Sequence, residues 1–131
     1  MDDFYREMIV DHYRYPRNHG MLPDPDISHE EHNPVCGDQI RIDIKLDGER
    51  VAKVGFSGHG CAISQASASM LTDMIAGKTL DEVKQVSKDE SLEGLGFPLG
   101  PVRLKCALLS LKALKVGVYG TQTWDGDDDE L

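Results

Sequence analysis

The sequence predicts an α+β fold in which helices pack on one face of a small antiparallel β-sheet. Helical periodicity near both ends of the chain flanks a central stretch in which apolar and polar residues alternate. The Asp47-Gly48 pair within that stretch is a strong hairpin-turn signal. The order of helix, hairpin and further helices is typical of an antiparallel sheet with its helices on one side.

The first predicted helix covers residues 3–15. Pro16 ends it, because proline cannot continue a helical hydrogen-bond pattern. Residues 16–35 contain four of the six prolines of the chain, so we expect a long ordered loop there. The apolar residues of the helix recur at helical spacing: Phe4, Tyr5, Met8, Ile9 and Tyr13.

Two strands form the predicted hairpin. Residues 40–46 alternate branched apolar with charged side chains, and a second strand over about residues 50–57 follows the turn. A two-residue loop at Asp47-Gly48 pairs Leu46 with Glu49, whereas a four-residue loop places Cys36 opposite Cys61. Either register brings one group of residues to the open end of the hairpin: Cys36, Asp38 and Cys61.

Three helices are predicted after the hairpin. The first covers Ser64–Ala76, with Gly77 as its C-terminal cap. Thr79 and Glu82 form a capping box that opens a short helix ending near Ser87. A stretch rich in glycine and proline, residues 94–101, then leads into a last helix over residues 102–116.

Length and charge limit the possible functions. At 131 residues we expect one domain over residues 1–120 and a disordered acidic tail over residues 121–131. No apolar run approaches the roughly 18 residues of a membrane helix, and the start of the chain lacks the pattern of a signal peptide, so we expect a cytoplasmic protein. The net charge of −9 argues against non-specific nucleic-acid binding.

The three cysteines carry most of the functional information. An odd number of cysteines disfavours a disulfide framework. Three thiolates and the carboxylate of Asp38 would complete a four-ligand shell for zinc, or most of one for iron and sulfide. Cys61 precedes a helix, where the helix dipole favours a thiolate. Cys106 lies about 120° from the centre of the apolar stripe of the last helix, so we expect it outside the core.

Four sequence motifs resemble the U-type iron–sulfur cluster assembly scaffolds, a family that includes IscU, SufU and the N-terminal domain of NifU. The resemblance covers roughly residues 4–118. The first motif runs from Tyr5 through Asp11-His12-Tyr13 to Asn18-His19-Gly20. The other three are Asn33-Pro34-Val35-Cys36-Gly37-Asp38, Gly60-Cys61-Ala62-Ile63-Ser64 and Pro101-Val102-Arg103-Leu104-Lys105-Cys106.

The resemblance implies a scaffold or carrier protein, not an enzyme in the ordinary sense. Such a scaffold receives sulfur from a pyridoxal-phosphate cysteine desulfurase, assembles iron and sulfide into a [2Fe–2S] cluster and passes it to apo-proteins. Cys36, Cys61 and Cys106 would be the cluster ligands, with Asp38 as a fourth ligand or gate. Cys106 would also be a candidate persulfide acceptor.

The alternative implied by the resemblance is a zinc-dependent sulfur acceptor that activates a SufS-type desulfurase. Lys105 stands where the IscU branch has histidine, which is similar to the SufU branch, and it could stabilise the neighbouring thiolate. The spacing between Cys61 and Cys106 is closer to the shorter IscU pattern. Gly100 and Arg103 depart from the segment that a dedicated Hsp70 chaperone reads in IscU proteins, which counts against that partnership.

The histidines offer weaker candidates. His59 could be a fifth ligand or the base of a cysteine-nucleophile hydrolase, but no orienting partner is evident and a solvated loop position is favoured. For His12 and His19 we expect positions on a helix surface or packed in a loop. His29 and His32 flank Glu30 and Glu31 and could form an accessory metal cluster with them, but we expect an exposed loop there.

Overall fold

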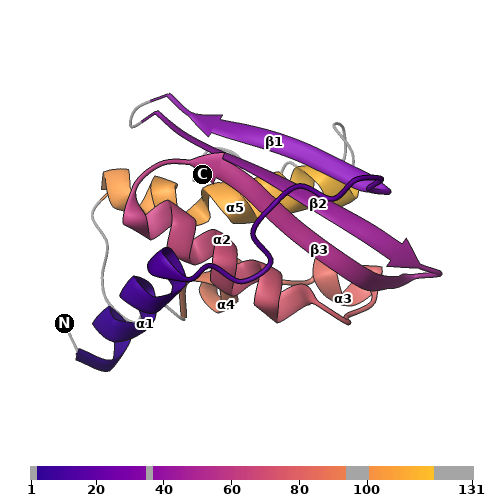
Figure 1. The fold of residues 1–131 in the computed structure, drawn as a ribbon, viewed down its shortest axis with the longest axis horizontal. Helices are drawn as coiled ribbons and strands as arrows, with labels where there is room; N and C mark the ends of the chain where they lie inside the picture. The colour runs from indigo at the N-terminus through magenta and orange to yellow at the C-terminus, as the bar shows by residue number, and fades with distance from the viewer. Residues whose placement is uncertain (1–2, 35–36, 94–100, 120–131) are drawn as a thin grey trace.

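The structure, a computed structural model, describes residues 3–34, 37–93 and 101–119. Its described part contains one antiparallel sheet with the strand order β1-β2-β3, formed by β1 (Ile27–Asn33), β2 (Asp38–Asp47) and β3 (Arg50–His59) (Figure 1). The predicted α+β class with a small antiparallel sheet is therefore confirmed. The acidic tail and residues 94–100 lie outside the described residues.

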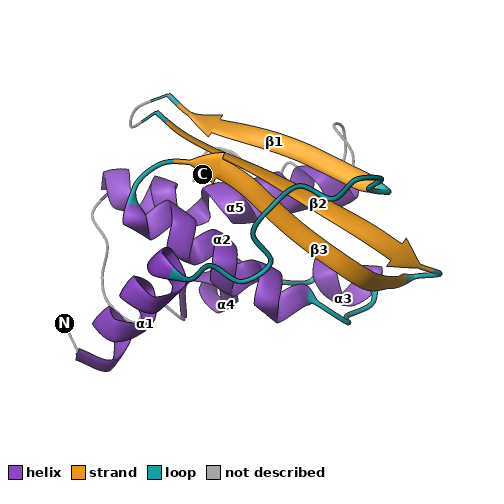
Figure 2. Ribbon diagram, in the orientation of Figure 1, coloured by secondary structure: helices purple, strands orange, loops and turns teal. Residues whose placement is uncertain are grey.

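The helices lie on one side of this sheet. They are α1 (Asp3–Arg14), α2 (Ala62–Ile75), α3 (Leu80–Lys84), α4 (Lys88–Glu93) and α5 (Pro101–Tyr119). Helix α5 packs against β1 and β2, α2 packs against β3 and α5, and α1 packs on the outside of α2 (Figure 2). No helix among the described residues is long and apolar enough to span a membrane.

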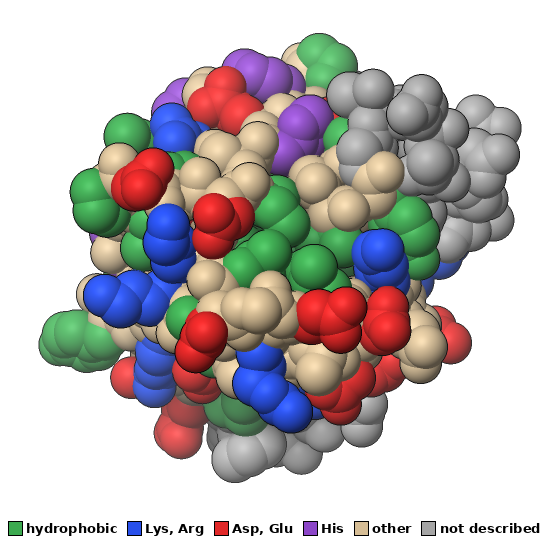
Figure 3. All heavy atoms as spheres, turned by 90° about the vertical axis from the view of Figure 1, so that its right-hand side faces the viewer, with side chains coloured by type: hydrophobic (Ala, Val, Ile, Leu, Met, Phe, Trp, Pro, Cys, Tyr) green, Lys and Arg blue, Asp and Glu red, His purple; other side chains and the backbone are tan. Residues whose placement is uncertain are grey.

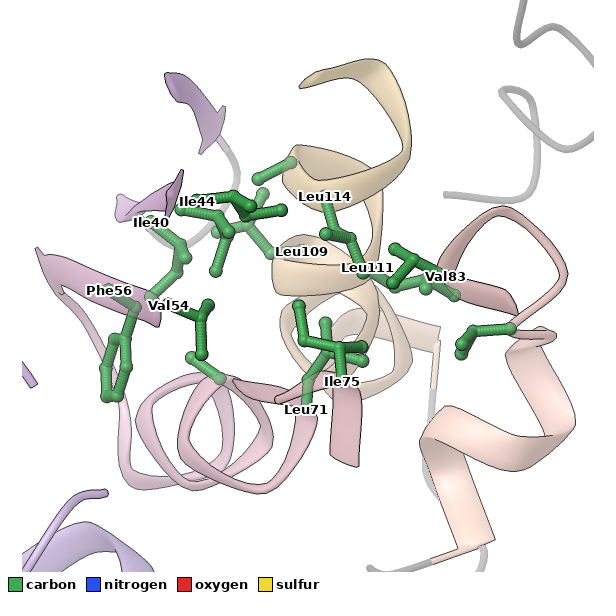
Figure 4. Close-up of a cluster of buried hydrophobic side chains, with 14 of the residues drawn as sticks. Ile40, Ile44, Val54, Phe56, Leu71, Ile75, Val83, Leu109, Leu111 and Leu114 are labelled. Atoms are coloured by element: carbon green, nitrogen blue, oxygen red, sulfur yellow. The ribbon is translucent and has the colours of Figure 1, made fainter. Parts of the chain in front are cut away.

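The core lies between the sheet and helices α2 and α5. Ile40, Ile44 and Phe56 project from the strands toward Leu71 of α2 and Leu111 of α5, and all five side chains are fully buried (Figure 4). Burying a side chain of this size stabilises the fold by about 1.5–3 kcal/mol. The alternation over residues 40–46 predicted the inward row of β2 correctly.

Strand β1 corrects the prediction of a loop over residues 16–35. Its side chains alternate between half-buried and exposed, but the inward row is largely polar and includes His29 and Glu31. Glu31 lies 4.0 Å from the ammonium of Lys112 on α5, which compensates part of the cost of its partial burial. Because this inward row is largely polar, a search for alternating apolar residues does not detect the strand.

The connection from α1 to β1 closes the outer edge of β3. Phe56 donates its amide to the carbonyl of Asn18 and accepts from the amide of Gly20, at 2.9 and 2.7 Å. The outward side chain of Asp43 is buried beneath this connection, where it accepts hydrogen bonds from the Leu22 amide and Arg41 Nε. The outward face of the hairpin is therefore partly a packing surface, in contrast with the solvated face expected of a polar row.

The β2–β3 turn differs from the two-residue Asp47-Gly48 loop. Asp47 pairs with Arg50, and Gly48 and Glu49 form the loop, with Gly48 at φ +64°. The predicted Leu46–Glu49 pairing is wrong. Leu46 pairs with Val51, which is the register of the four-residue alternative, although the additional pair Asp47–Arg50 shortens the loop itself to two residues. An irregularity between Lys45 and Leu46 shifts the pairing by one further residue, so that the far end of the hairpin closes on Gln39 and His59.

Helix α4 is a second departure, because only α3 was predicted between α2 and α5. The Thr79 capping box that opens α3 is confirmed. Helix α4 begins with the same device: Ser87 Oγ accepts the Glu90 amide at 3.1 Å, and Glu90 Oε1 accepts the Ser87 amide at 3.2 Å. The Ser-x-x-Glu pattern at residues 87–90 was therefore the missed signal.

The end of the molecule that carries the β2–β3 turn has a mixed surface. Lysine and arginine side chains are interspersed with aspartate and glutamate around a small apolar area on the side shown in Figure 3. Among the described side chains on this face, the two charge signs are therefore interspersed. The predicted metal ligands belong to the opposite end of the sheet, where β2 begins and β3 ends (Figure 1).

Candidate metal centre

Three elements bring potential ligands together at that end of the sheet. Asp38 is the first residue of β2, Cys61 immediately precedes α2, and Cys106 lies in the second turn of α5. One carboxylate oxygen and the two sulfur atoms all lie within 4.8 Å of one another. Within the described ranges no other group of three histidine, cysteine or acidic residues meets in this way. Three of the four predicted ligands are therefore neighbours.

Asp38 and Cys61 are joined by two contacts. Cys61 donates its backbone amide to Asp38 Oδ1 at 3.1 Å, and its sulfur lies 3.4 Å from Asp38 Oδ2. Cys61 is the N-cap of α2, and its carbonyl accepts the Gln65 amide. The buried carboxylate therefore lies against a helix N-terminus, where free amides and the helix dipole favour negative charge.

Gly60 provides the space that this carboxylate occupies. Its φ is +154°, and a β-carbon at this position would lie 2.4 Å from Asp38 Oδ1 and 2.7 Å from Ser64 Oγ. Both distances are too short for any real contact with a β-carbon. A glycine directly before Cys61 is thus required for the Asp38 side chain to reach the start of α2.

Cys106 is buried, which corrects the expectation that it lies outside the core. Its exposed fraction is only 2%, whereas Cys61 is exposed. The expectation assumed one buried stripe on the last helix, but α5 packs against β1, β2, α2 and α4 and is buried on several sides. A residue 120° from one stripe can therefore face another partner, and Cys106 faces Asn33 at the end of β1.

The remaining predicted residues lie apart from this group or outside the described part of the chain. Cys36 lies outside the described residues, so its role as a ligand stays a prediction. Lys105 is exposed on α5 beside Cys106. His59 is exposed at the end of β3 and does not join the three ligands.

The other histidines have structural contacts. His12 is buried and its Nδ1 lies 2.7 Å from Ser69 Oγ on α2, and burial, followed by the nearby Arg17 charge, lowers its pKa. The His19 ring packs edge-on against Phe56. His29 and His32 each pair with a glutamate two residues away on β1, His29 with Glu31 and His32 with Glu30. None of the four belongs to the metal-ligand group.

The separation of Asp38 and Cys61 is compatible with a tetrahedral metal ion. With bond lengths of about 2.3 Å to sulfur and about 2.0 Å to oxygen, a tetrahedral zinc ion separates a thiolate and a carboxylate ligand by about 3.5 Å. The Asp38–Cys61 separation is 3.4 Å. Two thiolates and one carboxylate also suit iron, and a fourth ligand would complete either shell. The donor set therefore fits both zinc and an iron–sulfur cluster.

Sequence reasoning missed one polar residue at this centre. Asn33 is buried, and its side-chain amide donates toward Cys106 Sγ at 3.9 Å. It lies directly opposite Asp38 in the β1–β2 pairing, so both side chains are on the helix-facing side of the sheet. Recognising the polar alternation of residues 27–33 as a strand would have placed Asn33 beside the ligands.

Comparisons with known proteins show the family to which this chain belongs. The family model described as the NifU-like N terminal domain matches residues 4–124. The chain is 44% identical to the zinc-dependent sulfurtransferase SufU of Bacillus subtilis, over 90% of this chain and 91% of that protein. It is 34% identical to an iron–sulfur cluster assembly scaffold protein IscU of Archaeoglobus fulgidus, over 97% of this chain and 82% of that protein.

A solved structure supports the same relationship. It is described as a candidate iron–sulfur cluster assembly scaffold protein for the SUF system from Fervidobacterium islandicum AW-1. It superposes with a TM-score of 0.76 and 29% identity, covering 86% of this chain and 94% of that one. The fold of this chain thus recurs in a protein described as a scaffold of this kind.

Proposed function

Because this chain belongs to the family of NifU-like N-terminal domains, we propose that it is an iron–sulfur cluster assembly scaffold. In this function it accepts sulfur from a pyridoxal-phosphate cysteine desulfurase, assembles a [2Fe–2S] cluster and transfers it to apo-proteins in the cytoplasm. The single observation that carries the proposal is the meeting of Asp38, Cys61 and Cys106 within 4.8 Å at one end of the sheet.

The proposed ligand set has soft and hard members. Cys36, Cys61 and Cys106 would hold iron through thiolates, which dominate affinity at such sites. Asp38 would supply a harder and weaker oxygen ligand that can leave when the cluster is delivered. In the structure this carboxylate is held by the Cys61 amide, so its departure as a gate requires that hydrogen bond to break.

The difference in exposure between the two described thiols suggests an order for sulfur delivery. Cys61 is exposed and Cys106 is buried, so a donor persulfide reaches Cys61 first. The Cys61 thiolate attacks the terminal sulfur of the donor, and the donor cysteine leaves as a thiolate. Cys106, the persulfide carrier expected from the sequence, can then attack that terminal sulfur and release Cys61 as a thiolate. Neither exchange requires an external oxidant or reductant.

Cluster reconstitution tests the main proposal. The full chain, purified without oxygen, is mixed with a cysteine desulfurase, cysteine, ferrous iron and dithiothreitol, which reduces the persulfide sulfur to sulfide, and cluster formation is followed by visible absorbance. Transfer to an apo-ferredoxin is then followed by the appearance of the ferredoxin spectrum. We expect cluster uptake and transfer in the parent protein and little uptake in Cys61→Ser. Absence of a cluster in the parent protein would contradict the scaffold function.

A zinc-dependent sulfurtransferase is the second candidate. It is favoured by the 44% identity to the Bacillus subtilis relative, which is described as a zinc-dependent sulfurtransferase, and the 3.4 Å Asp38–Cys61 separation is compatible with a tetrahedral zinc ion. In this function zinc would be resident, the chain would activate its desulfurase, and Lys105 would stabilise the neighbouring thiolate. Stoichiometric zinc, no cluster uptake and faster desulfurase turnover in the same experiment would support this candidate over the scaffold.

A further inference from the structure

Asn33 occupies a buried position beside the ligand group but is not one of the metal ligands proposed above. It is the last residue of β1 and its exposed fraction is 6%. Its Nδ2 lies 3.9 Å from Cys106 Sγ, and its Cα is paired with that of Asp38 on β2. One side chain therefore adjoins a carboxylate ligand on one strand and reaches a thiol ligand on a helix.

We propose that Asn33 is a positioning residue that holds the Cys106 sulfur through an N–H···S hydrogen bond. The inference rests on the proposed function in one respect, namely that Cys106 binds a metal or cluster. A side-chain amide is an effective donor to a thiolate because it is neutral at all working pH values and carries two N–H groups. Donation to sulfur stabilises the negative charge of the thiolate and fixes the direction of its remaining lone pairs.

The backbone of Asn33 makes a second connection within the site. Its carbonyl accepts the amide of Gly37 at 2.8 Å, which closes the turn between β1 and β2. Asn33 thus connects two parts of the site: its backbone is bonded to Gly37, directly before β2, and its side chain reaches the sulfur of Cys106 on α5. This double connection is the reason to assign it a role beyond filling space.

The contact itself can be tested in the metal-free protein. The chain contains two asparagines, Asn18 and Asn33, so labelling with ¹⁵N-asparagine gives two side-chain amide signals in an NMR spectrum. Asn18 donates to Thr72 Oγ1 at 3.2 Å, and it serves as an internal control. We expect Cys106→Ala to shift the Asn33 side-chain protons upfield and to leave those of Asn18 in place. Unchanged Asn33 protons would overturn the proposal.

The consequence for the metal is tested by zinc affinity from chelator competition. Loss of a partner that orients a ligand typically weakens metal binding by about 10–100-fold. We expect a loss in this range for Asn33→Ala and none for His32→Ala. His32 directly precedes Asn33 on β1, but its side chain lies on the opposite, exposed face. In a Cys106→Ala background, Asn33→Ala should cause no further loss, since the sulfur that it holds is then absent.

The outcomes distinguish a failure of the positioning role of Asn33 from a failure of the proposed function. An equal loss from Asn33→Ala with and without Cys106 would indicate a general structural effect and overturn the positioning role. A parent protein that binds neither zinc nor a cluster would instead contradict the proposed function. In that event the NMR comparison still decides whether Asn33 holds the Cys106 sulfur.

Discussion

The Asp38 carboxylate accepts the backbone amide of Cys61 at 3.1 Å, although the two residues are 23 positions apart in the sequence. The same carboxylate lies 3.4 Å from the Cys61 sulfur through its other oxygen. The interaction at the start of α2 and the proposed metal site thus share one side chain. Two of the proposed ligands are therefore held side by side by contacts between them.

Replacing Asp38 with alanine should separate the two candidate functions. For the scaffold, we expect slower cluster release to an apo-acceptor and a longer-lived cluster, because the weak oxygen ligand that opens the site is lost. For a tetrahedral zinc site we expect weaker binding, because water replaces the fourth ligand. The measurements are cluster lifetime by visible absorbance and zinc affinity by chelator competition.

The matched control for this variant is Asp47→Ala, at the exposed far end of the same strand. Asp38→Ala should also destabilise the fold by about 1–3 kcal/mol, because the Cys61 amide loses its charged acceptor. A cluster that decays faster in Asp38→Ala than in the parent protein would contradict the gating role.

Each of the three cysteines should be needed for the site. We expect Cys36→Ser, Cys61→Ser and Cys106→Ser to weaken zinc or cluster retention by more than the roughly 10–100-fold that loss of an outer-shell partner costs. The fold should survive, since serine has nearly the same size as cysteine and neither Cys61 nor Cys106 belongs to the main hydrophobic cluster, and circular dichroism can check this. Full occupancy in any one variant would remove that residue from the ligand set.

Gly60→Ala should disturb the site without removing a ligand. The new β-carbon would overlap Asp38 Oδ1, and φ at this position is +154°, so the carboxylate or the start of α2 must move. We expect zinc affinity to fall by about 10–100-fold. Gly48→Ala is the control, because it introduces backbone strain at φ +64° with nothing within 4 Å of the new carbon. Equal zinc affinities in the two variants would show that the Asp38 contact with Gly60 has no effect on binding.

His12 should make stability depend on pH. Burial, with a smaller effect of the Arg17 charge, lowers its pKa below the usual 6.5, while the Asp11 and Asp73 charges oppose this in part. The unfolded chain therefore takes up the proton at a higher pH than the folded chain. The stability contribution is complete above about 6.5 and is lost as the pH falls through the lower folded pKa.

Denaturant unfolding at pH 7.5 and at pH 5 measures this effect. We expect a lower free energy of unfolding at the acidic pH in the parent protein and a smaller difference in His12→Gln, which can still bond Ser69. His59→Gln, at an exposed position, should behave as the parent does. If the pH dependence persists unchanged in His12→Gln, other groups must cause it.

Lys105→His should change the behaviour of the neighbouring thiol. An imidazole next to Cys106 offers a neutral nitrogen ligand in place of an ammonium, so we expect tighter cluster retention. Lys112→His introduces the same change elsewhere on α5. It is the control that shows whether the effect on cluster retention depends on the position next to Cys106. If retention stays the same while stimulation of the desulfurase falls, then Lys105 serves sulfur transfer or partner docking instead.

The sequence predicted the proximity of Asp38 and Cys61 better than it predicted the residues around them. The alternation around Ile42 and the turn near Gly48 sufficed to bring Asp38 toward Cys61, because a hairpin determines which residues share its open end. The burial of Cys106 was not predictable from α5 alone. Several elements cover that helix, and one of them is β1. This strand was not predicted, because its inward-facing side chains are largely polar and give no apolar alternation.

The three proposed ligands that the structure describes come from separate elements, and this affects how well the protein would resist proteolysis. An unfolded molecule presents its cysteines one at a time and cannot offer the clustered site. Cargo that binds only the folded form raises the free energy of unfolding by about 2.7 kcal/mol when its concentration is 100 times the Kd. A loaded molecule should therefore resist proteases that degrade an empty one, so delivery of the cargo would also shorten the survival of its carrier.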